Sequence, residues 1–218
     1  MIEIDSQDSS QHIDMVETRT AEETLNGTVK TSMRTIIRYI DSFIDRIHDE
    51  DIDKMIDAML SAEKIFIVGR GRSGLVGRAF AMRLMHLDLN VHVVGETTTP
   101  SFARNDVLIA ISGSGETSGV LVSAEVVIKR GGKVVAITSY PKSMLARMAD
   151  VLVIVKGRSK EPIPKSYSER ELTPKDLAPL GTLFEDTCML FLDGVIACLM
   201  KKLEKKEEDM QKKHSVLD

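Results

Sequence analysis

The sequence predicts an α/β fold in three layers, with a five-stranded parallel sheet flanked by helices on both faces. Three observations lead to this prediction. Five short apolar runs are spaced along the chain, segments of helical periodicity separate them, and two of the runs end in glycine-rich turns. Short runs that are apolar throughout are typical of strands buried on both faces, as strands are in a parallel sheet.

The five predicted strands are rich in valine and isoleucine, which favour the extended conformation. Helical segments between successive runs provide the crossovers that parallel pairing requires. The predicted strands are KIFIVG (64–69), VHVVG (91–95), DVLIAIS (106–112), KVVAITS (133–139) and VLVIV (151–155).

The predicted helices precede, separate and follow these strands. Over 28–62 apolar residues recur at helical spacing, and the polar stretch 48–51 breaks the pattern. We therefore expect two helices there, with Asp51 as a cap of the second. The other predicted helices cover 73–87, 118–130, 143–148 and 183 to about 213.

Two segments lack regular patterning. Residues 1–27 are polar and are predicted to be an N-terminal tail, which leaves 28–218 as a single domain. Residues 157–180 hold four prolines and many charged side chains, so we expect an extended loop.

Composition narrows the class of protein. A formal net charge of −4 argues against a general nucleic-acid binder, and no apolar run approaches the ~20 residues that span a bilayer. The two cysteines, Cys188 and Cys198, would lie about 15 Å apart on one helix, too far for a disulfide, so we expect two buried thiols. With no predicted signal peptide, these features favour a cytoplasmic location.

The first glycine-rich turn, GRGRSG (69–74), follows a predicted strand and opens a helix. It fits the G-x-G-x-x-G pattern of dinucleotide-binding proteins, and Glu96 follows the next strand at a suitable distance. A nicotinamide-dependent oxidoreductase is therefore one interpretation. The two arginines inside the turn do not belong to that pattern, and the chain is short for a second nucleotide-binding half and a substrate domain.

The second turn, SGSGET (112–117), favours a different ligand. Ser112, Ser114 and Thr117 offer hydroxyls, and Gly113 and Gly115 let successive backbone amides point inward. The helix that follows adds the positive end of its dipole. Because the turn contains no lysine, it is not a P-loop, and we expect it to hold the phosphate of a sugar phosphate. The simpler alternative is a serine-rich turn with an ordinary helix cap.

The turn SGSGET after a buried strand resembles the phosphate loop of the sugar isomerase (SIS) domain family. Within that family, the stretches FIVGRGRSGLVGRAFAMRLMHL, VVGETTTPS, GTLFEDTCMLFLD and KKHSVLD are similar to 6-phospho-3-hexuloisomerases. The resemblance runs from about residue 30 to the end. The polar tail and the long loop at 157–178 depart from it.

The resemblance implies an isomerase that interconverts D-arabino-hex-3-ulose 6-phosphate and D-fructose 6-phosphate through a cis-enediol, without metal or cofactor. It adds Ser73 to the substrate-binding residues 112–117, among them Glu116. It also implies a homotetramer that works beside a hexulose-phosphate synthase in the ribulose monophosphate pathway of formaldehyde assimilation. A non-catalytic SIS regulator that binds a sugar phosphate, and an SIS isomerase of another sugar phosphate, are the alternatives.

The expected proton carrier is Glu185, since the resemblance places the catalytic glutamate in the GTxFE motif and apolar neighbours help a carboxyl hold its proton. The alternative for Glu185 is a first-turn acid that complements the helix dipole, with Asp186 and Glu116 as rival bases. Arg72 either offsets the charge of the enediolate or pairs with an acid on the surface.

Two more residues, Glu96 and His214, are candidates for the site. Glu96 either binds sugar hydroxyls or belongs to the turn after its strand. His214 is either solvated near the terminus or reaches the site of a neighbouring subunit, as the resemblance implies. Apolar stripes on the N-terminal helices and on 183–200 exceed what one small sheet needs, and so indicate subunit contacts.

Overall fold

The structure, a computed structural model, describes residues 27–157, 178 and 180–214. Residues 1–26 of the predicted tail, most of the predicted loop and the last four residues lie outside the described residues.

All five predicted strands are confirmed, with bounds within two residues of those expected. They form one parallel sheet in the order β2-β1-β3-β4-β5. The strands are β1 (Ile65–Gly69), β2 (Val91–Val93), β3 (Val107–Ile111), β4 (Lys133–Thr138) and β5 (Val151–Ile154).

The helices surround this sheet. Residues 27–44 are helical, and the helices that follow are α2 (Asp49–Leu60), α3 (Gly71–His86), α4 (Ser118–Lys129), α5 (Met144–Met148), α7 (Thr182–Lys202) and α8 (Glu207–Gln211). Across the described part of the chain, no helix combines the length and the apolar character needed to cross a bilayer.

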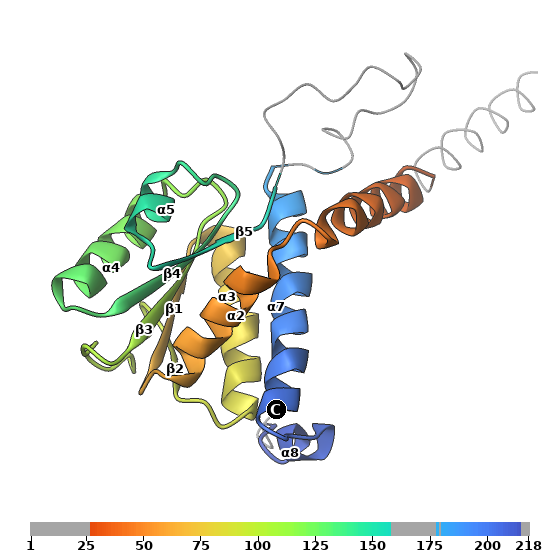
Figure 1. The fold of residues 1–218 in the computed structure, drawn as a ribbon. Coiled ribbons are helices and arrows are strands. Elements are labelled where there is room, and N and C mark those ends of the chain that lie inside the picture. Colours follow the sequence, from red (N-terminus) through yellow and green to blue (C-terminus); the bar gives the residue numbers. More distant parts are fainter. Residues whose placement is uncertain (1–26, 158–177, 179, 215–218) are drawn as a thin grey trace, which may run out of the picture.

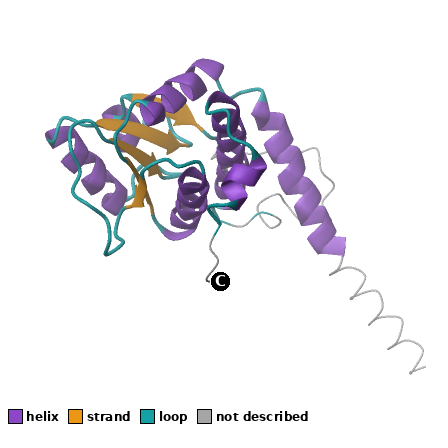
Figure 2. Ribbon diagram, turned by 90° about the horizontal axis from the view of Figure 1, so that it is seen from below, coloured by secondary structure: helices purple, strands orange, loops and turns teal. Residues whose placement is uncertain are grey.

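The three-layer arrangement is confirmed. Helices α4 and α5 cover one face of the sheet, and α2, α3 and α7 cover the other (Figures 1 and 2). Side chains of β1 alternate between the two faces, with Ile65 and Ile67 in the core beneath α3 and α7 and Phe66 and Val68 in the core beneath α4. This alternation explains why β1, like β3, is apolar along its whole length.

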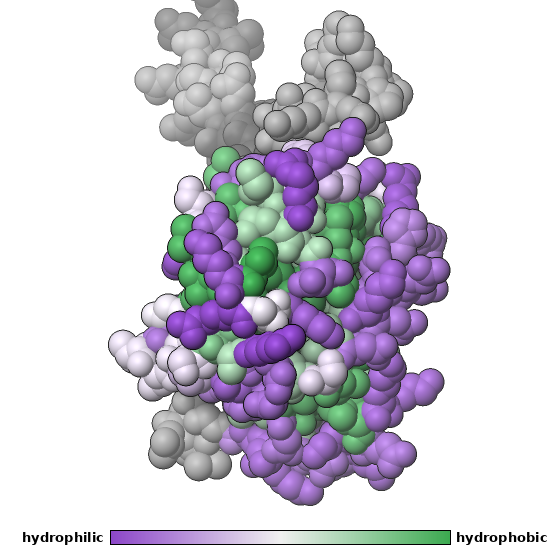
Figure 3. Space-filling model, turned by 60° about the vertical axis from the view of Figure 1, so that its left-hand side comes forward, coloured by the Kyte–Doolittle hydropathy of each residue, from purple (hydrophilic) through white to green (hydrophobic). Residues whose placement is uncertain are grey.

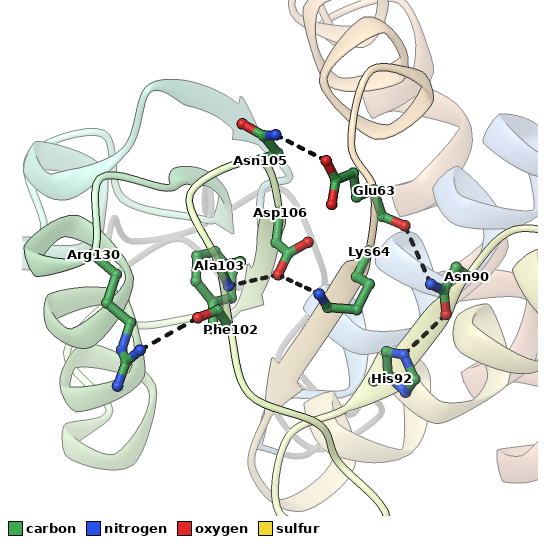
Figure 4. A network of polar contacts seen from close by, with 9 residues as sticks. All are labelled: Glu63, Lys64, Asn90, His92, Phe102, Ala103, Asn105, Asp106 and Arg130. Atoms are coloured by element: carbon green, nitrogen blue, oxygen red, sulfur yellow. Dashed lines mark hydrogen bonds and ion pairs between the residues drawn. The ribbon is translucent and has the colours of Figure 1, made fainter.

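A polar network pins the strands β1 and β3 together at their amino ends (Figure 4). The buried Asp106 carboxylate pairs with Lys64 Nζ at 3.1 Å and accepts a hydrogen bond from the Ala103 amide at 2.7 Å. Next to it, Asn105 donates to the carboxylate of Glu63 at 2.8 Å. The network holds these two strands in register, so their carboxyl ends finish side by side at the opposite edge of the sheet.

The prediction of a single helix from 183 to about 213 is wrong beyond Lys202, where α7 ends. The chain turns at Glu204, whose φ is +54°, and α8 folds back along the end of α3. The turn lets Met210 join the core, and two lysines of this segment form ion pairs with Asp88 after α3. Because Met210 stands alone among charged residues, its burial could not be read from helical periodicity.

The start of α2 also differs from the prediction. Its N-cap is His48, which has extended backbone and makes no side-chain capping bond. Asp51 lies in the first turn of the helix, where an acid complements the positive end of the helix dipole.

Candidate active site

The strand order places the two glycine-rich loops beside each other. The chain passes from β1 to β2 on one side and then crosses to β3 on the other, so the sheet changes winding direction between β1 and β3. Gly69 at the end of β1 pairs with Ile111 at the end of β3. Ligands of open α/β sheets bind at such a point, beyond the carboxyl ends of the strands.

The first loop makes a tight turn from β1 into α3. A Cβ on Gly69 would come within 2.7 Å of the Ser73 carbonyl oxygen and 2.9 Å of the Gly74 amide nitrogen, so only glycine fits there. The turn brings Ser73 into the first turn of α3, where the residue is buried. Its hydroxyl makes no hydrogen bond to another described residue, and it remains available to a ligand.

The hydroxyls of the second loop face one another. Ser112 Oγ and Thr117 Oγ1 lie 2.9 Å apart, and Ser112 Oγ accepts a hydrogen bond from the Gly115 amide at 3.1 Å. Ser114 Oγ accepts from the Glu116 amide at 3.2 Å. The loop therefore closes into a ring of polar groups, and we call the hydroxyls of Ser112, Ser114 and Thr117 the hydroxyl ring.

Several backbone amides of this loop lack an acceptor and so indicate a bound ligand. Among the described residues, the amides of Gly113, Ser114 and Thr117 find no acceptor. Thr117 is the N-cap of α4, yet its hydroxyl bonds to Ser112 and the helix has no side-chain cap. Unfilled amide donors at a helix N-terminus favour an anion with several acceptor oxygens, such as a phosphate.

Contacts with β4 and α5 hold the loop rigid. The Gly113 carbonyl accepts hydrogen bonds from the Ser139 amide at 3.1 Å and from Thr138 Oγ1 at 3.3 Å. The Gly115 carbonyl accepts from the Leu145 amide at 3.0 Å. These contacts within the protein fix the shape of the loop, and a rigid site lowers the entropic cost of binding.

Glu185 is brought to this loop by α7. Its neighbour Phe184 is buried and packs its ring on Gly113, where a Cβ would meet the ring at 3.0 to 3.4 Å. The Glu185 carboxylate folds back over Gly181, whose own Cβ would lie 2.5 Å from Oε1. The GTLFE sequence therefore contains an anchor, a carboxylate and the glycine that leaves room for it.

Arg72 links the first loop to α7. Its Nε donates to Glu185 Oε2 at 2.6 Å, and its Nη2 donates to Asp186 Oδ1 at 3.2 Å. The Glu185 side chain is only 13% exposed, whereas that of Arg72 is 56% exposed. The hydrogen bond to Glu185 raises the pKa of the Arg72 guanidinium above its usual value, so the arginine stays charged.

This pairing changes one expectation. Glu185 was predicted to lie in apolar surroundings, and in the structure it is held by a cation instead. Asp186, the expected rival base, takes the second nitrogen of the same guanidinium. The result is a positioned carboxylate beside a positive charge, close to the hydroxyl ring through Phe184.

Two predicted binding residues are engaged elsewhere. Glu96 forms an ion pair with Arg78 on α3, so the structure favours the turn-and-surface interpretation of this residue. Glu116 Oε1 accepts a hydrogen bond from the Met144 amide at 2.8 Å, so its carboxylate serves the start of α5 rather than the ring.

His214 is not near the site of its own chain. Its ring lies against that of His86, with centroids 5.6 Å apart, at the far end of α3. Arg72 and His86 are separated along α3 by about 21 Å. A role in the site of another subunit stays a prediction.

The sequence prediction missed Phe184 as an anchor and Asp186 as a partner of Arg72. The signal for Phe184 was present, because an aromatic residue directly before the predicted base needs an apolar surface to bury it. No sequence signal pairs Asp186 with an arginine 114 positions away.

Comparison with known proteins identifies the family. The SIS domain model matches residues 58–172, more than half of the chain. The chain belongs to the SIS domain family. This result argues against the dinucleotide-dependent oxidoreductase.

Three similar proteins are informative. A protein of Methanothermobacter thermautotrophicus is 49% identical over 73% of this chain and 81% of its own length. The 3-hexulose-6-phosphate isomerase of Bacillus subtilis is 41% identical over 73% of this chain and 82% of its own length. A solved structure of a Methanococcus jannaschii protein, for which the function of 3-hexulose-6-phosphate isomerase was inferred, has a TM-score of 0.70 at 38% identity; the match covers 86% of this chain and 97% of that protein.

Proposed function

We propose that the chain is a 3-hexulose-6-phosphate isomerase, which interconverts D-arabino-hex-3-ulose 6-phosphate and D-fructose 6-phosphate. The observation that carries the proposal is the Glu185 carboxylate held by Arg72 beside a hydroxyl ring suited to a phosphate. The B. subtilis relative with this name, at 41% identity, supports the choice of substrate.

The substrate phosphate would occupy the ring formed by Ser112, Ser114 and Thr117, with Ser73 beside it. Unfilled amides and hydroxyls supply hydrogen bonds to its oxygens. Binding at this end fixes the distance from the phosphate to the carbons that react, so that C2 and C3 can lie under the carboxylate of Glu185.

The reaction needs one proton carrier. Glu185 would remove the proton from C2 of the 3-ketose, and the electron pair left behind forms the C2=C3 bond while the C3 carbonyl oxygen becomes an enediolate oxygen. Return of the proton from Glu185 to C3, together with transfer of the C2 hydroxyl proton to the C3 oxygen, then leaves a carbonyl at C2 and a hydroxyl at C3. No hydrogen is gained or lost overall.

Arg72 is suited to stabilise the enediolate. Its exposed guanidinium lies 2.6 Å from the carboxylate of the base, so a substrate placed at the base is also near this charge. Asp186 holds the second nitrogen and fixes the orientation of the guanidinium. Charge placed in advance where charge develops lowers the barrier without reorganisation.

The decisive experiment compares Glu185→Gln with the wild type in an assay that couples fructose 6-phosphate formation to NADPH production. Loss of the base should lower kcat at least about 10²-fold while the protein still binds the sugar phosphate. Asp193→Asn is the matched control, since this exposed acid lies two turns further along α7. In D₂O the wild type should place deuterium at C3 of the product.

Other outcomes would reassign the activity. Full activity of Glu185→Gln would move the base to another residue. Turnover of a pentose or heptose phosphate in preference to the hexulose phosphate would name another SIS isomerase. Tight sugar-phosphate binding without any turnover would identify a regulator.

We also propose a homotetramer. Exposed apolar residues form a stripe along the helix at 27–44, among them Val29, Met33, Ile37 and Ile44. This helix extends away from the body of the domain (Figure 1). It borders an apolar groove of about 860 Å³ shared with α2 and α7.

The space-filling view in Figure 3 also shows apolar side chains among polar ones on the surface of the domain. Ile37→Asp should lower the molar mass measured by light scattering, whereas an unchanged mass would place the contact elsewhere. In such an assembly His214 would reach a site only by crossing to a neighbouring subunit.

The cellular setting follows from the proposed activity. The substrate would come from a hexulose-phosphate synthase in the ribulose monophosphate pathway of formaldehyde assimilation, and the location would be the cytoplasm.

The two cysteines are free. Cys188 is buried and Cys198 is only half-buried, so the expectation of two buried thiols is corrected for Cys198.

A further inference from the structure

Arg70 stands between two glycines of the first loop and caps α3 with extended backbone, φ −127° and ψ 151°. Its side chain does not follow α3. Instead its guanidinium reaches the first turn of α4, where a Cβ on Gly119 would lie 2.9 Å from Nε and 3.2 Å from Nη2. Arg70 therefore joins the beginnings of two helices that cover opposite faces of the sheet.

The electrostatics of this position are unfavourable without a ligand. A cation at the N-terminus of a helix is repelled by the positive end of the helix dipole. Within the described residues, Arg70 has no carboxylate in ion-pair contact, in contrast to Arg72 and Arg78 on the same helix. An anion placed between Arg70 and the first turn of α4 would remove the repulsion.

The hydroxyl ring itself has no positive charge to balance that of a phosphate. It binds through neutral groups and contains no lysine, and its one ionisable side chain is the acidic Glu116. A phosphate monoester carries nearly two negative charges at neutral pH. Arg72 is already shared between Glu185 and Asp186, so it does not provide this charge.

We propose that Arg70 binds the phosphate group of the substrate, and that Gly119 is required because it leaves room for the guanidinium. The inference rests on the proposed function and deepens it. Arg70 makes the site select phosphorylated ketoses over free ones, while Glu185 and Arg72 act on the carbon atoms.

The test measures binding of inorganic phosphate to the full chain by calorimetry, together with KM and kcat for the hexulose phosphate. Arg70→Ala should weaken phosphate binding and raise KM about tenfold, with kcat nearly unchanged, because one charge-assisted hydrogen bond is lost. Its affinity should also depend less on ionic strength than that of the wild type.

Gly119→Ala supplies a second test in the same place. The new methyl group should push the flexible guanidinium away, so phosphate affinity should fall while stability is kept. In an Arg70→Ala background, the same substitution should cost nothing more. Arg104→Ala, at the opposite edge of the sheet, controls for the loss of one positive charge.

Each outcome is decisive. Unchanged phosphate affinity in Arg70→Ala, or an equal loss in Arg104→Ala, would overturn the proposal. An equal effect of Gly119→Ala in both backgrounds would overturn the contact between Arg70 and Gly119. A wild type that binds phosphate but does not turn over any hexulose phosphate would overturn the proposed activity. The phosphate affinities of the variants would then still decide whether Arg70 binds phosphate.

Discussion

Replacing Gly115 by alanine tests whether the second glycine-rich loop (112–117) depends on one crowded, left-handed glycine. Gly115 has a φ of +66°, which side chains rarely tolerate. A Cβ there would lie 2.1 Å from Ser143 Oγ, 2.4 Å from Ser143 Cβ and 2.9 Å from Thr138 Oγ1. All three atoms belong to the supports of the loop.

The expected destabilisation has separate sources. Left-handed backbone costs an alanine roughly 1–2 kcal/mol relative to glycine. The overlap with Ser143 adds roughly 1–3 kcal/mol, because Ser143 is buried and its hydroxyl caps α5 by accepting from the Ala146 amide. We therefore expect the free energy of unfolding to fall by about 2–5 kcal/mol.

Gly131→Ala is the matched control. Its φ is +73°, and a Cβ there would make only an ordinary contact of 3.7 Å with the flexible Arg104 side chain. This variant should lose only the backbone contribution, about 1–2 kcal/mol. Urea unfolding of both variants and the wild type, at one protein concentration, measures the difference from the midpoints if the slopes agree.

The activity data must agree with the stability data. Gly115→Ala should raise KM for the sugar phosphate, since the Gly115 amide orients Ser112 Oγ, whereas Gly131→Ala should not. If Gly115→Ala is no less stable than Gly131→Ala, or binds substrate equally well, the crowding read from this loop is wrong.

Two further predictions concern the opposite edge of the sheet. Lys64→Met leaves the buried Asp106 carboxylate without its ion-pair partner, so the free energy of unfolding should fall by about 3 kcal/mol with KM unchanged; equal stability in urea would contradict this. Burial, with Arg83 and His214 nearby, lowers the pKa of His86 from its usual 6.5, so the unfolded chain takes up the proton more readily. Stability should therefore be complete above about pH 6.5 and fall as the pH drops below it, and the decline measured by urea unfolding should be smaller in His86→Gln; identical declines would exclude this histidine.

The sheet and its covering helices were predictable because their signals are local. Five short apolar runs became five strands, and the glycine-rich turn ended β1 as expected. The break after Lys202 was not predictable, since it depends on the burial of Met210 with residues that are distant in the sequence.

For the candidate site, the sequence by itself indicated the expected kind of ligand: a turn of hydroxyls and glycines behind a buried strand favours a phosphate because of its residue types alone. Only the tertiary structure decided the partners of each charged group. Arg72 meets Glu185 across 113 positions because α3 and α7 lie side by side on one face of the sheet, and Arg70 meets Gly119 because β1 and β3 end together. Such contacts depend on how elements pack in space, and no spacing along the chain encodes them.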